Sequence, residues 1–211
     1  IAGGTLRMSE NNDYGGTLNV GGNFTHTSGT IENGDNNIRK TSFIVFNKAG
    51  IQTYTSGGAV TDYINFTVNS GSTLQMASPT TVVGNGSIGS FTLSPGATLG
   101  VTSTTGITTT GPTGNIRVSG TRTYSTGANY IYNGGVNQAR GNGLTQNTPA
   151  NLEIDNAGFT VSLGANTSIS GNLDITAGTL NSNGQNITLG GNWTNNGGAF
   201  TGGAQTVTFT G

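Results

Sequence analysis

Two carboxylates in one short segment are the first residues in this sequence that could carry out chemistry. Glu153 and Asp155 alternate within residues 151–156, so in a strand both side chains would share one face. Glycoside hydrolysis needs two carboxyl groups ~5–10 Å apart, and this spacing permits that separation. No aromatic platform accompanies the pair, so the sequence favours a simpler interpretation, in which both are solvated charges on a strand surface.

Two segments rich in Asp and Asn offer oxygen ligands of the kind that calcium prefers. They are residues 9–13, Ser-Glu-Asn-Asn-Asp, and residues 33–37, Asn-Gly-Asp-Asn-Asn. Neither matches an EF-hand loop or a glycine–aspartate nonapeptide repeat, and both compositions suit turns. The sequence therefore predicts turns and leaves a weak calcium site open. It predicts no catalytic residue, no cofactor and no assigned metal site.

The single histidine, His26, lies in the strand-like segment 24–27, on the side of Phe24. A half-buried or rim position is expected, because no second histidine exists to complete a metal site.

Hydroxyl and aromatic side chains suggest two further kinds of surface. The run from Thr102 to Thr110 is the densest in threonine, and a flat threonine array can bind ice if it repeats in register on successive coils. Outside this run threonine follows no fixed Thr-x-Thr step, so ordinary β-surface chemistry is favoured. The sequence allows two places for Tyr124, Tyr130 and Tyr132. They could form an exposed strip that contacts sugars or a neighbouring subunit, or they could belong to the core, and the core is favoured.

Composition excludes several classes of function. The 211 residues contain no Cys, one His and a formal net charge of −1, which leaves no disulfide framework, no thiolate metal site and no basic patch for nucleic acid. No apolar run approaches the ~18 residues that a membrane-spanning helix needs. Gly, Thr, Asn and Ser make up more than half of the chain, which is typical of a surface or a material rather than of an enzyme.

Apolar residues alternate strictly with polar ones along most of the chain, which argues against disorder and predicts short strands with one buried face. The alternating pairs are Leu18 and Val20, Phe66 and Val68, Phe91 and Leu93, Ile116 and Val118, Leu152 and Ile154, Leu173 and Ile175, Ile187 and Leu189, and Val207 and Phe209. No stretch shows helical spacing. The chain is therefore predicted to be all-β.

Internal similarity indicates a repeat. Phe46, Asn47, Gln52 and Asn65 recur 86 residues later as Tyr132, Asn133, Gln138 and Asn151, and segment 21–25 recurs as segment 190–194. These matches predict a single repeat domain with two long units, about 17–102 and 103–188, and a partial third at 189–211.

Strand–turn segments of about 20 residues suit the coils of a parallel β-solenoid, or β-helix. Inward Val, Ile, Leu and Phe would stack into a narrow core, with Gly and Asn at the corners. Roughly ten coils, ~50 Å long and right-handed, are expected. An antiparallel β-sandwich is the alternative fold.

The segments Asn-Leu-Glu-Ile-Asp-Asn (151–156), Ser-Gly-Asn-Leu-Asp-Ile (170–175) and Ile-Thr-Leu-Gly-Gly-Asn-Trp-Thr (187–194) resemble those of long β-strand-repeat surface proteins of Bacteroidetes, many of them exported by type IX secretion. The resemblance covers most of the chain and is strongest over 115–211. It implies an extracellular, adhesin-like or fibre-like protein and brings no catalytic motif. Neither a secretion signal nor a sorting domain is present, so we expect a mature or excised piece of a larger protein.

The sequence thus favours a non-enzymatic structural or adhesive rod, stalk or fibre segment on the bacterial surface. Its expected partners are neighbouring coils or copies of itself, stacked end to end or side by side, and a surface polysaccharide is a further candidate partner. A carbohydrate-binding or carbohydrate-cleaving β-helix is the alternative, and ice binding is a third hypothesis.

Overall fold

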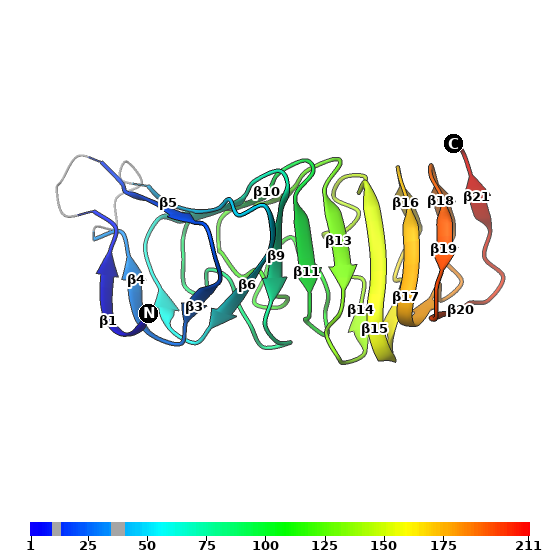
Figure 1. The fold of residues 1–211 in the computed structure, drawn as a ribbon, viewed down its shortest axis with the longest axis horizontal. Coiled ribbons are helices and arrows are strands. Elements are labelled where there is room, and N and C mark those ends of the chain that lie inside the picture. Colours follow the sequence, from blue (N-terminus) through cyan, green and yellow to red (C-terminus); the bar gives the residue numbers. More distant parts are fainter. Residues whose placement is uncertain (10–13, 35–40) are drawn as a thin grey trace.

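The computed structural model describes residues 1–9, 14–34 and 41–211, which form a rod of stacked β-coils (Figure 1). The two ends of the chain lie near opposite ends of the rod, and the chain makes about nine turns between them. Every strand pair among the described residues is parallel, as in the pairs of β5 with β8 and of β13 with β15. The predicted β-solenoid is therefore confirmed, and the antiparallel sandwich is not the fold.

Four parallel sheets, here named A to D, form the walls of the rod. Sheet A holds β1 (Ala2–Arg7), β4 (Ser28–Glu32) and β7 (Ala59–Val60). Sheet B holds β2 (Thr17–Val20), β5 (Ser42–Phe46), β8 (Ile64–Val68), β10 (Phe91–Leu93) and β12 (Arg122–Tyr124).

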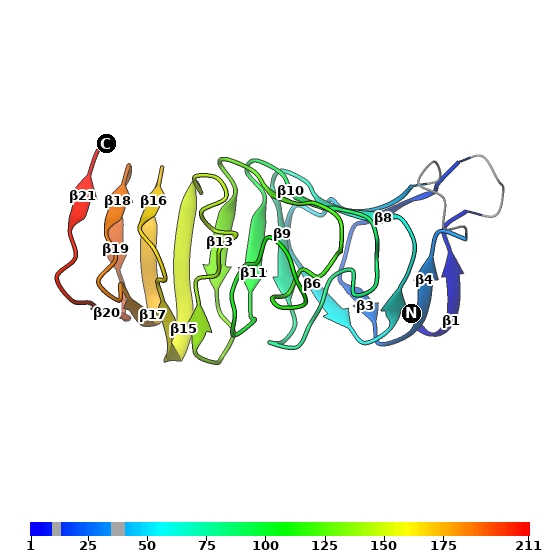
Figure 2. The same ribbon diagram turned by 180° about the vertical axis from the view of Figure 1, so that it is seen from behind.

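Sheet C is the longest and runs along most of the rod. It holds β3 (Phe24–His26), β6 (Gly50–Ser56), β9 (Ser72–Met76), β11 (Thr98–Val101), β13 (Asn129–Tyr132), β14 (Gln138–Ala139), β15 (Asn151–Ser162), β17 (Leu173–Asn181), β19 (Trp193–Asn195) and β20 (Ala199–Thr201). Sheet D, visible from behind in Figure 2, holds β16 (Thr167–Ile169), β18 (Ile187–Leu189) and β21 (Val207–Phe209).

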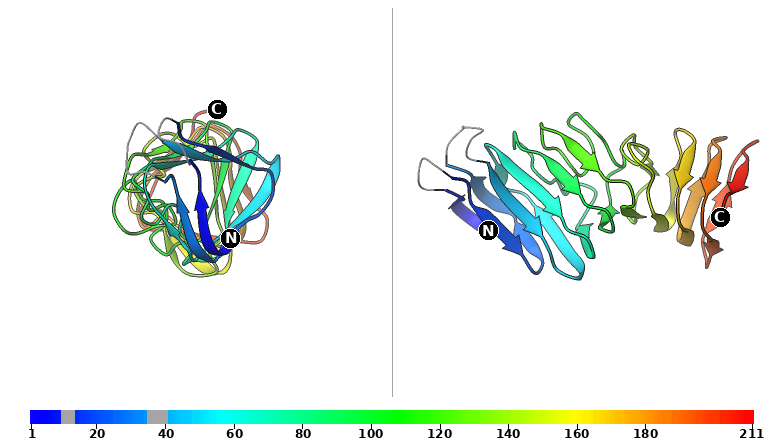
Figure 3. Two further views of the ribbon diagram at one scale, coloured as in Figure 1. Left: turned by 90° about the vertical axis from the view of Figure 1, so that its left-hand side faces the viewer. Right: turned by 90° about the horizontal axis from the view of Figure 1, so that it is seen from above.

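The core is a slender column of apolar side chains inside the coils, which are seen end-on in Figure 3. Ile44, Phe66 and Phe91 occupy matching positions on β5, β8 and β10, and each is fully buried. The predicted alternating pairs point inward, with two differences from the prediction. Ile116 is buried but makes a single isolated bridge to Val83 instead of lying in a strand. Phe209 lies in register with the buried Leu189 but is itself 60% exposed.

Asparagine side chains link successive coils beside sheet C. Asn172 donates its backbone N–H to the Oδ1 of Asn151 at 2.8 Å, and Asn192 donates to the Oδ1 of Asn172 at 2.9 Å. The Nδ2 of Asn151 in turn donates to the Oδ1 of Asn129 at 2.8 Å. These bonds satisfy corner N–H groups that the strand ladders do not reach, which explains why Asn recurs near the starts of these strands.

The sequence match at an offset of 86 residues marks a shared corner. Gln52 accepts from the N–H of Lys48 at 3.0 Å and donates to the carbonyls of Val20 and Gly22, both at 3.3 Å. Gln138 forms the equivalent set of bonds, but Gln52 follows a strand of sheet B and Gln138 follows a strand of sheet C. The match thus identifies a corner motif, and the division into units at 17–102 and 103–188 stays a prediction.

Replacing Gln138 with leucine is expected to lower the free energy of unfolding by about 3 kcal/mol. Gln138 is buried and accepts from the N–H of Gly134 at 3.0 Å, while its Nε2 donates to the carbonyls of Val101 at 2.9 Å and Ser103 at 3.1 Å. Leucine would leave the Gly134 N–H without an acceptor and would remove one of the two donors from each carbonyl, since Val101 also accepts from Asn133 and Ser103 from Gly106. Denaturant unfolding followed by circular dichroism measures the loss.

The control for this prediction is Asn137→Leu. Asn137 is exposed, and its side chain accepts one hydrogen bond, from the N–H of Thr160. An equal loss of stability in both variants would contradict a specific role for the corner glutamine.

Candidate interaction surfaces

The outward face of sheet B carries a row of threonines in register. Thr67 of β8 lies beside Thr92 of β10, and Thr92 lies beside Thr123 of β12. Each is half-buried, between two inward residues that are buried. Sequence reasoning missed this row because the first step is 25 residues and the second is 31, so no fixed interval in the sequence shows it.

Residues two positions before and after each threonine share its face, because side chains in a strand alternate. They are Asn65 and Asn69, Ser90 and Ser94, and Thr121 and Ser125. Sheet D repeats the central row with Ser168, Thr188 and Thr208 in register. Both faces therefore present short hydroxyl and amide side chains and no charged group in these coils.

The threonine run at 102–110 is not the β-surface that the sequence favoured. It belongs to a long connection between β11 and β12 that the structure describes without strands. Its hydroxyls are used within the protein, because Thr108 donates to the carbonyl of Thr113 at 2.7 Å and Thr105 accepts from the N–H of Gly114 at 2.9 Å. Side chains with local backbone partners favour loops over strands.

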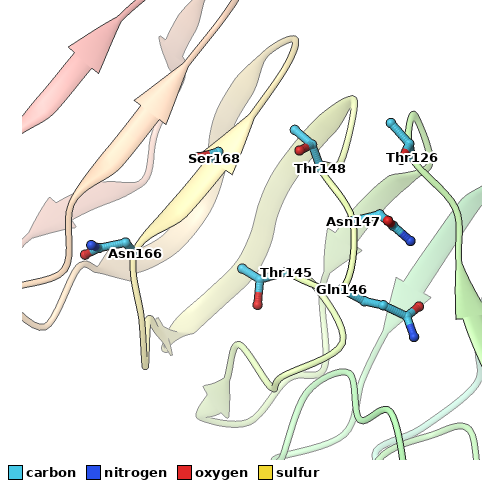
Figure 4. A pocket seen from close by; sticks show the side chains of 7 residues that line it. All are labelled: Thr126, Thr145, Gln146, Asn147, Thr148, Asn166 and Ser168. Atoms are coloured by element: carbon cyan, nitrogen blue, oxygen red, sulfur yellow. The ribbon is translucent and has the colours of Figure 1, made fainter.

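A polar pocket of about 390 Å³ lies between the end of β12 and the start of β16 (Figure 4). β12 is an edge strand of sheet B, and the side chains of two pocket residues form hydrogen bonds with its backbone. Gln146 accepts from the N–H of Tyr124 at 2.7 Å and donates to the carbonyl of Arg122 at 2.9 Å, and Asn147 donates to the carbonyl of Tyr124 at 2.8 Å. The lining consists of Thr126, Thr145, Gln146, Asn147, Thr148, Asn166 and Ser168. Neutral hydrogen-bonding groups line it, and it contains neither an acid nor a base for catalysis.

The carboxylates Glu153 and Asp155 point outward from β15 on either side of the buried Ile154, as their alternation predicted. Glu153 lies in register with Asp174 of the next coil, a residue that sequence reasoning did not connect with it. Asp155 follows an irregularity in the pairing and lies beside Ala177. Thr176 donates its hydroxyl to the Glu153 carboxylate at 3.1 Å. The arrangement is a half-exposed strand surface with two like charges on adjacent rungs, over a shallow trough of about 340 Å³.

The three tyrosines are core residues, which confirms the favoured interpretation. Tyr124, Tyr130 and Tyr132 are at most 2% exposed. The hydroxyl of Tyr124 donates to the carbonyl of Thr108 at 3.0 Å, and that of Tyr132 donates to the carbonyl of Arg140. Burial raises the pKa of all three phenols. They provide no aromatic platform for sugars.

His26 lies deeper than the rim position that the sequence predicted. It is 0% exposed, its Nε2 lies 3.3 Å from the carbonyl oxygen of Gly29, and its Nδ1 has no partner. The ring fills the space beside Gly58, where any Cβ would lie 2.0 Å from Nε2. Burial lowers the pKa of His26, the Gly29 carbonyl opposes this shift, and the nearby N-terminal ammonium adds to it.

We expect acid to destabilise the first coils through His26. Because its folded-state pKa lies below the ordinary value of 6.5, the unfolded chain binds its proton first as pH falls. The free energy of unfolding should therefore fall as pH decreases from 6.5 to the lower pKa of the folded state. Above pH 6.5 this group should not affect it. Unfolding midpoints measured at about pH 7.5 and about pH 5.5 should differ less in His26→Gln than in the unaltered chain. An identical pH dependence in both would remove His26 from this account.

The two segments considered for calcium lie largely outside the described residues, at 10–13 and 35–37. Within the described ranges, no three acidic or histidine residues gather as a metal site would require. The part of the chain that the structure describes also contains no helix long and apolar enough to cross a membrane.

Comparison with models of known protein families, with curated proteins and with solved structures found no match. The functional argument therefore depends on the fold and its surfaces.

Proposed function

We propose that the chain is a non-enzymatic structural or adhesive rod, exposed outside a bacterial cell. The observation that carries this proposal is the ladder of sheet C, in which parallel strands pair in sequence from β3 to β19 along the solenoid. Such a fold supplies length and a repeated outer surface. The resemblance to long surface proteins supports the extracellular location.

The mechanical argument starts from the backbone. Strands of one coil are hydrogen-bonded to the coils on both sides, as when β15 pairs with both β13 and β17. Pulling the coils apart would break many bonds together, because repeats in a solenoid contact only their neighbours and share the load between them. With 7% charged residues, little repulsion opposes side-by-side packing of such rods.

The C-terminal coil offers a surface for further coils. Trp193 and Phe200 pack edge-to-face with ring centroids 4.8 Å apart, and both are only half-buried. Their counterparts one coil earlier, Leu173 and Leu180, are 0% exposed. Open strand edges next to apolar side chains are a template for another strand. We propose that a second copy of the chain stacks end to end on this coil.

Electron microscopy of the bacterium that makes the protein, with antibody labelling, tests the proposal. Label on elongated, surface-attached structures is the expected result. Label only on dispersed compact particles, away from any elongated form, would refute the structural role.

A further inference from the structure

The threonine row on sheet B has a regular two-dimensional repeat. Parallel strands lie ~4.8 Å apart, so the hydroxyls of Thr67, Thr92 and Thr123 recur at that interval along the rod. Within a strand, same-face residues lie ~6.6 Å apart, which places Ser90 and Ser94 on either side of Thr92. The result is a grid of short polar side chains.

The hydroxyls of these three threonines make no hydrogen bond within the described part of the chain, in contrast to those of Thr105 and Thr108. They are also held in place, because a β-branched side chain in a strand has restricted rotamers. Their methyl groups stand beside the hydroxyls and present an apolar surface that water surrounds without bonding. Water that orders on this face therefore meets hydroxyl groups, which form hydrogen bonds, and methyl groups, which do not, in fixed positions.

This grid suits water in a tetrahedral lattice. Hydrogen-bonded water oxygens lie ~2.75 Å apart, so tetrahedral geometry places second neighbours ~4.5 Å apart. The rung spacing exceeds that distance by only ~0.3 Å. If the lattice is centred on Thr92, the hydroxyls of Thr67 and Thr123 are each displaced by ~0.3 Å, within the spread of O–H···O distances.

The chemistry of the face favours ice over an ionic or carbohydrate partner. Arg122 is the one charged residue within β8, β10 and β12, and it points inward with 2% exposure. The aromatic residues of these strands, Phe66, Phe91 and Tyr124, are buried as well. Within β8, β10 and β12 a polysaccharide would thus find no exposed ring on which to stack. The nearest exposed ring on this sheet, Phe43 of β5, is 40% exposed and lies one rung outside the grid, in register with Asn65. A lattice of water needs only spaced hydroxyls.

We propose that the outward face of β8, β10 and β12 binds ice through the in-register hydroxyl and methyl groups of Thr67, Thr92 and Thr123. This activity goes beyond the structural role and does not depend on it, since a single solenoid presents the whole grid.

The test uses the purified 211-residue chain in ice-growth and recrystallisation assays. The unaltered chain should shape ice crystals and slow their growth, and Thr92→Lys should reduce both effects to the level of buffer. Lysine at this outward position adds a charge at the centre of the grid and should leave the fold intact. The matched control is Thr73→Lys, at a half-buried outward position of β9 in sheet C, which should retain full activity.

Two results would overturn the proposal: no ice shaping by the unaltered chain, or full activity in Thr92→Lys with an unchanged circular dichroism spectrum. Co-sedimentation with microcrystalline cellulose or chitin tests the competing hypothesis, that the face binds a polysaccharide. Binding that Thr92→Lys abolishes, without any effect on ice, would assign the face to a polysaccharide and contradict ice binding.

Discussion

Replacing Phe66 with alanine is expected to lower the free energy of unfolding by about 3–5 kcal/mol, the range for a large buried aromatic side chain. Phe66 is 0% exposed in β8 and lies in register between Ile44 of β5 and Phe91 of β10. The core is one column wide, so few neighbouring side chains can move in to fill the cavity. The effect should spread to the coils on either side.

Denaturant unfolding measures this loss, and hydrogen exchange of β5 and β10 locates it. The matched control is Thr67→Ala at the next position, which points outward and should change stability by no more than about 0.5 kcal/mol. Comparable losses in both variants would mean that the inward and outward assignments of β8 are wrong.

Replacing Arg122 with methionine is expected to release the long connection at 102–118 and to cost about 2–4 kcal/mol. Arg122 occupies an inward position beside Phe91, where neighbouring coils place apolar residues. Its guanidinium donates to the carbonyls of Thr108 at 3.2 Å, Gly111 at 2.6 Å and Val118 at 3.1 Å. Burial lowers the pKa of Arg122, and these carbonyls offset the cost of the buried charge. Methionine fills a similar volume but removes the guanidinium donor from the Gly111 and Val118 carbonyls, while Thr108 keeps the Tyr124 hydroxyl as its donor.

Hydrogen exchange across 105–118 is the direct measurement. In Arg122→Met, exchange relative to the unaltered chain should accelerate more in this connection than in β15. Arg117→Met serves as the control, because Arg117 is less buried and, among the described residues, its side chain makes one hydrogen bond, from Nε to the carbonyl of Gly114 at 3.1 Å. Unchanged exchange in Arg122→Met would show that the connection is held by other contacts.

The fold was predictable from the sequence because alternation is a local property. Leu152 and Ile154 point inward as their spacing predicted, and both are buried. Arg122 was not predictable, since arginine is seldom buried and only the neighbouring carbonyls reveal its role. The row of Thr67, Thr92 and Thr123 depends on register between coils of unequal length. Coil length is set by connections such as 102–118, whose conformation follows from contacts distant in sequence.

The candidate site residues show the same limit. Glu153 and Asp155 are neighbours in sequence, but the register places Asp174 beside Glu153. The burial of the tyrosines followed from their place in alternating strands. The depth of His26 did not, because it depends on the absence of a side chain at Gly58 in the following coil.

Chemical bridging of paired cysteines tests the central claim, that successive coils stack in parallel register. The chain contains no cysteine, so the double variant Thr67→Cys/Thr92→Cys places two thiols on adjacent rungs, ~4.8 Å apart. Dibromobimane becomes fluorescent when it bridges two nearby thiols, and this variant should be bridged efficiently. The variant Thr67→Cys/Thr123→Cys, two rungs and ~9.6 Å apart, should not be. Failure of the first pair, or equal bridging of both, would contradict the stacked parallel solenoid.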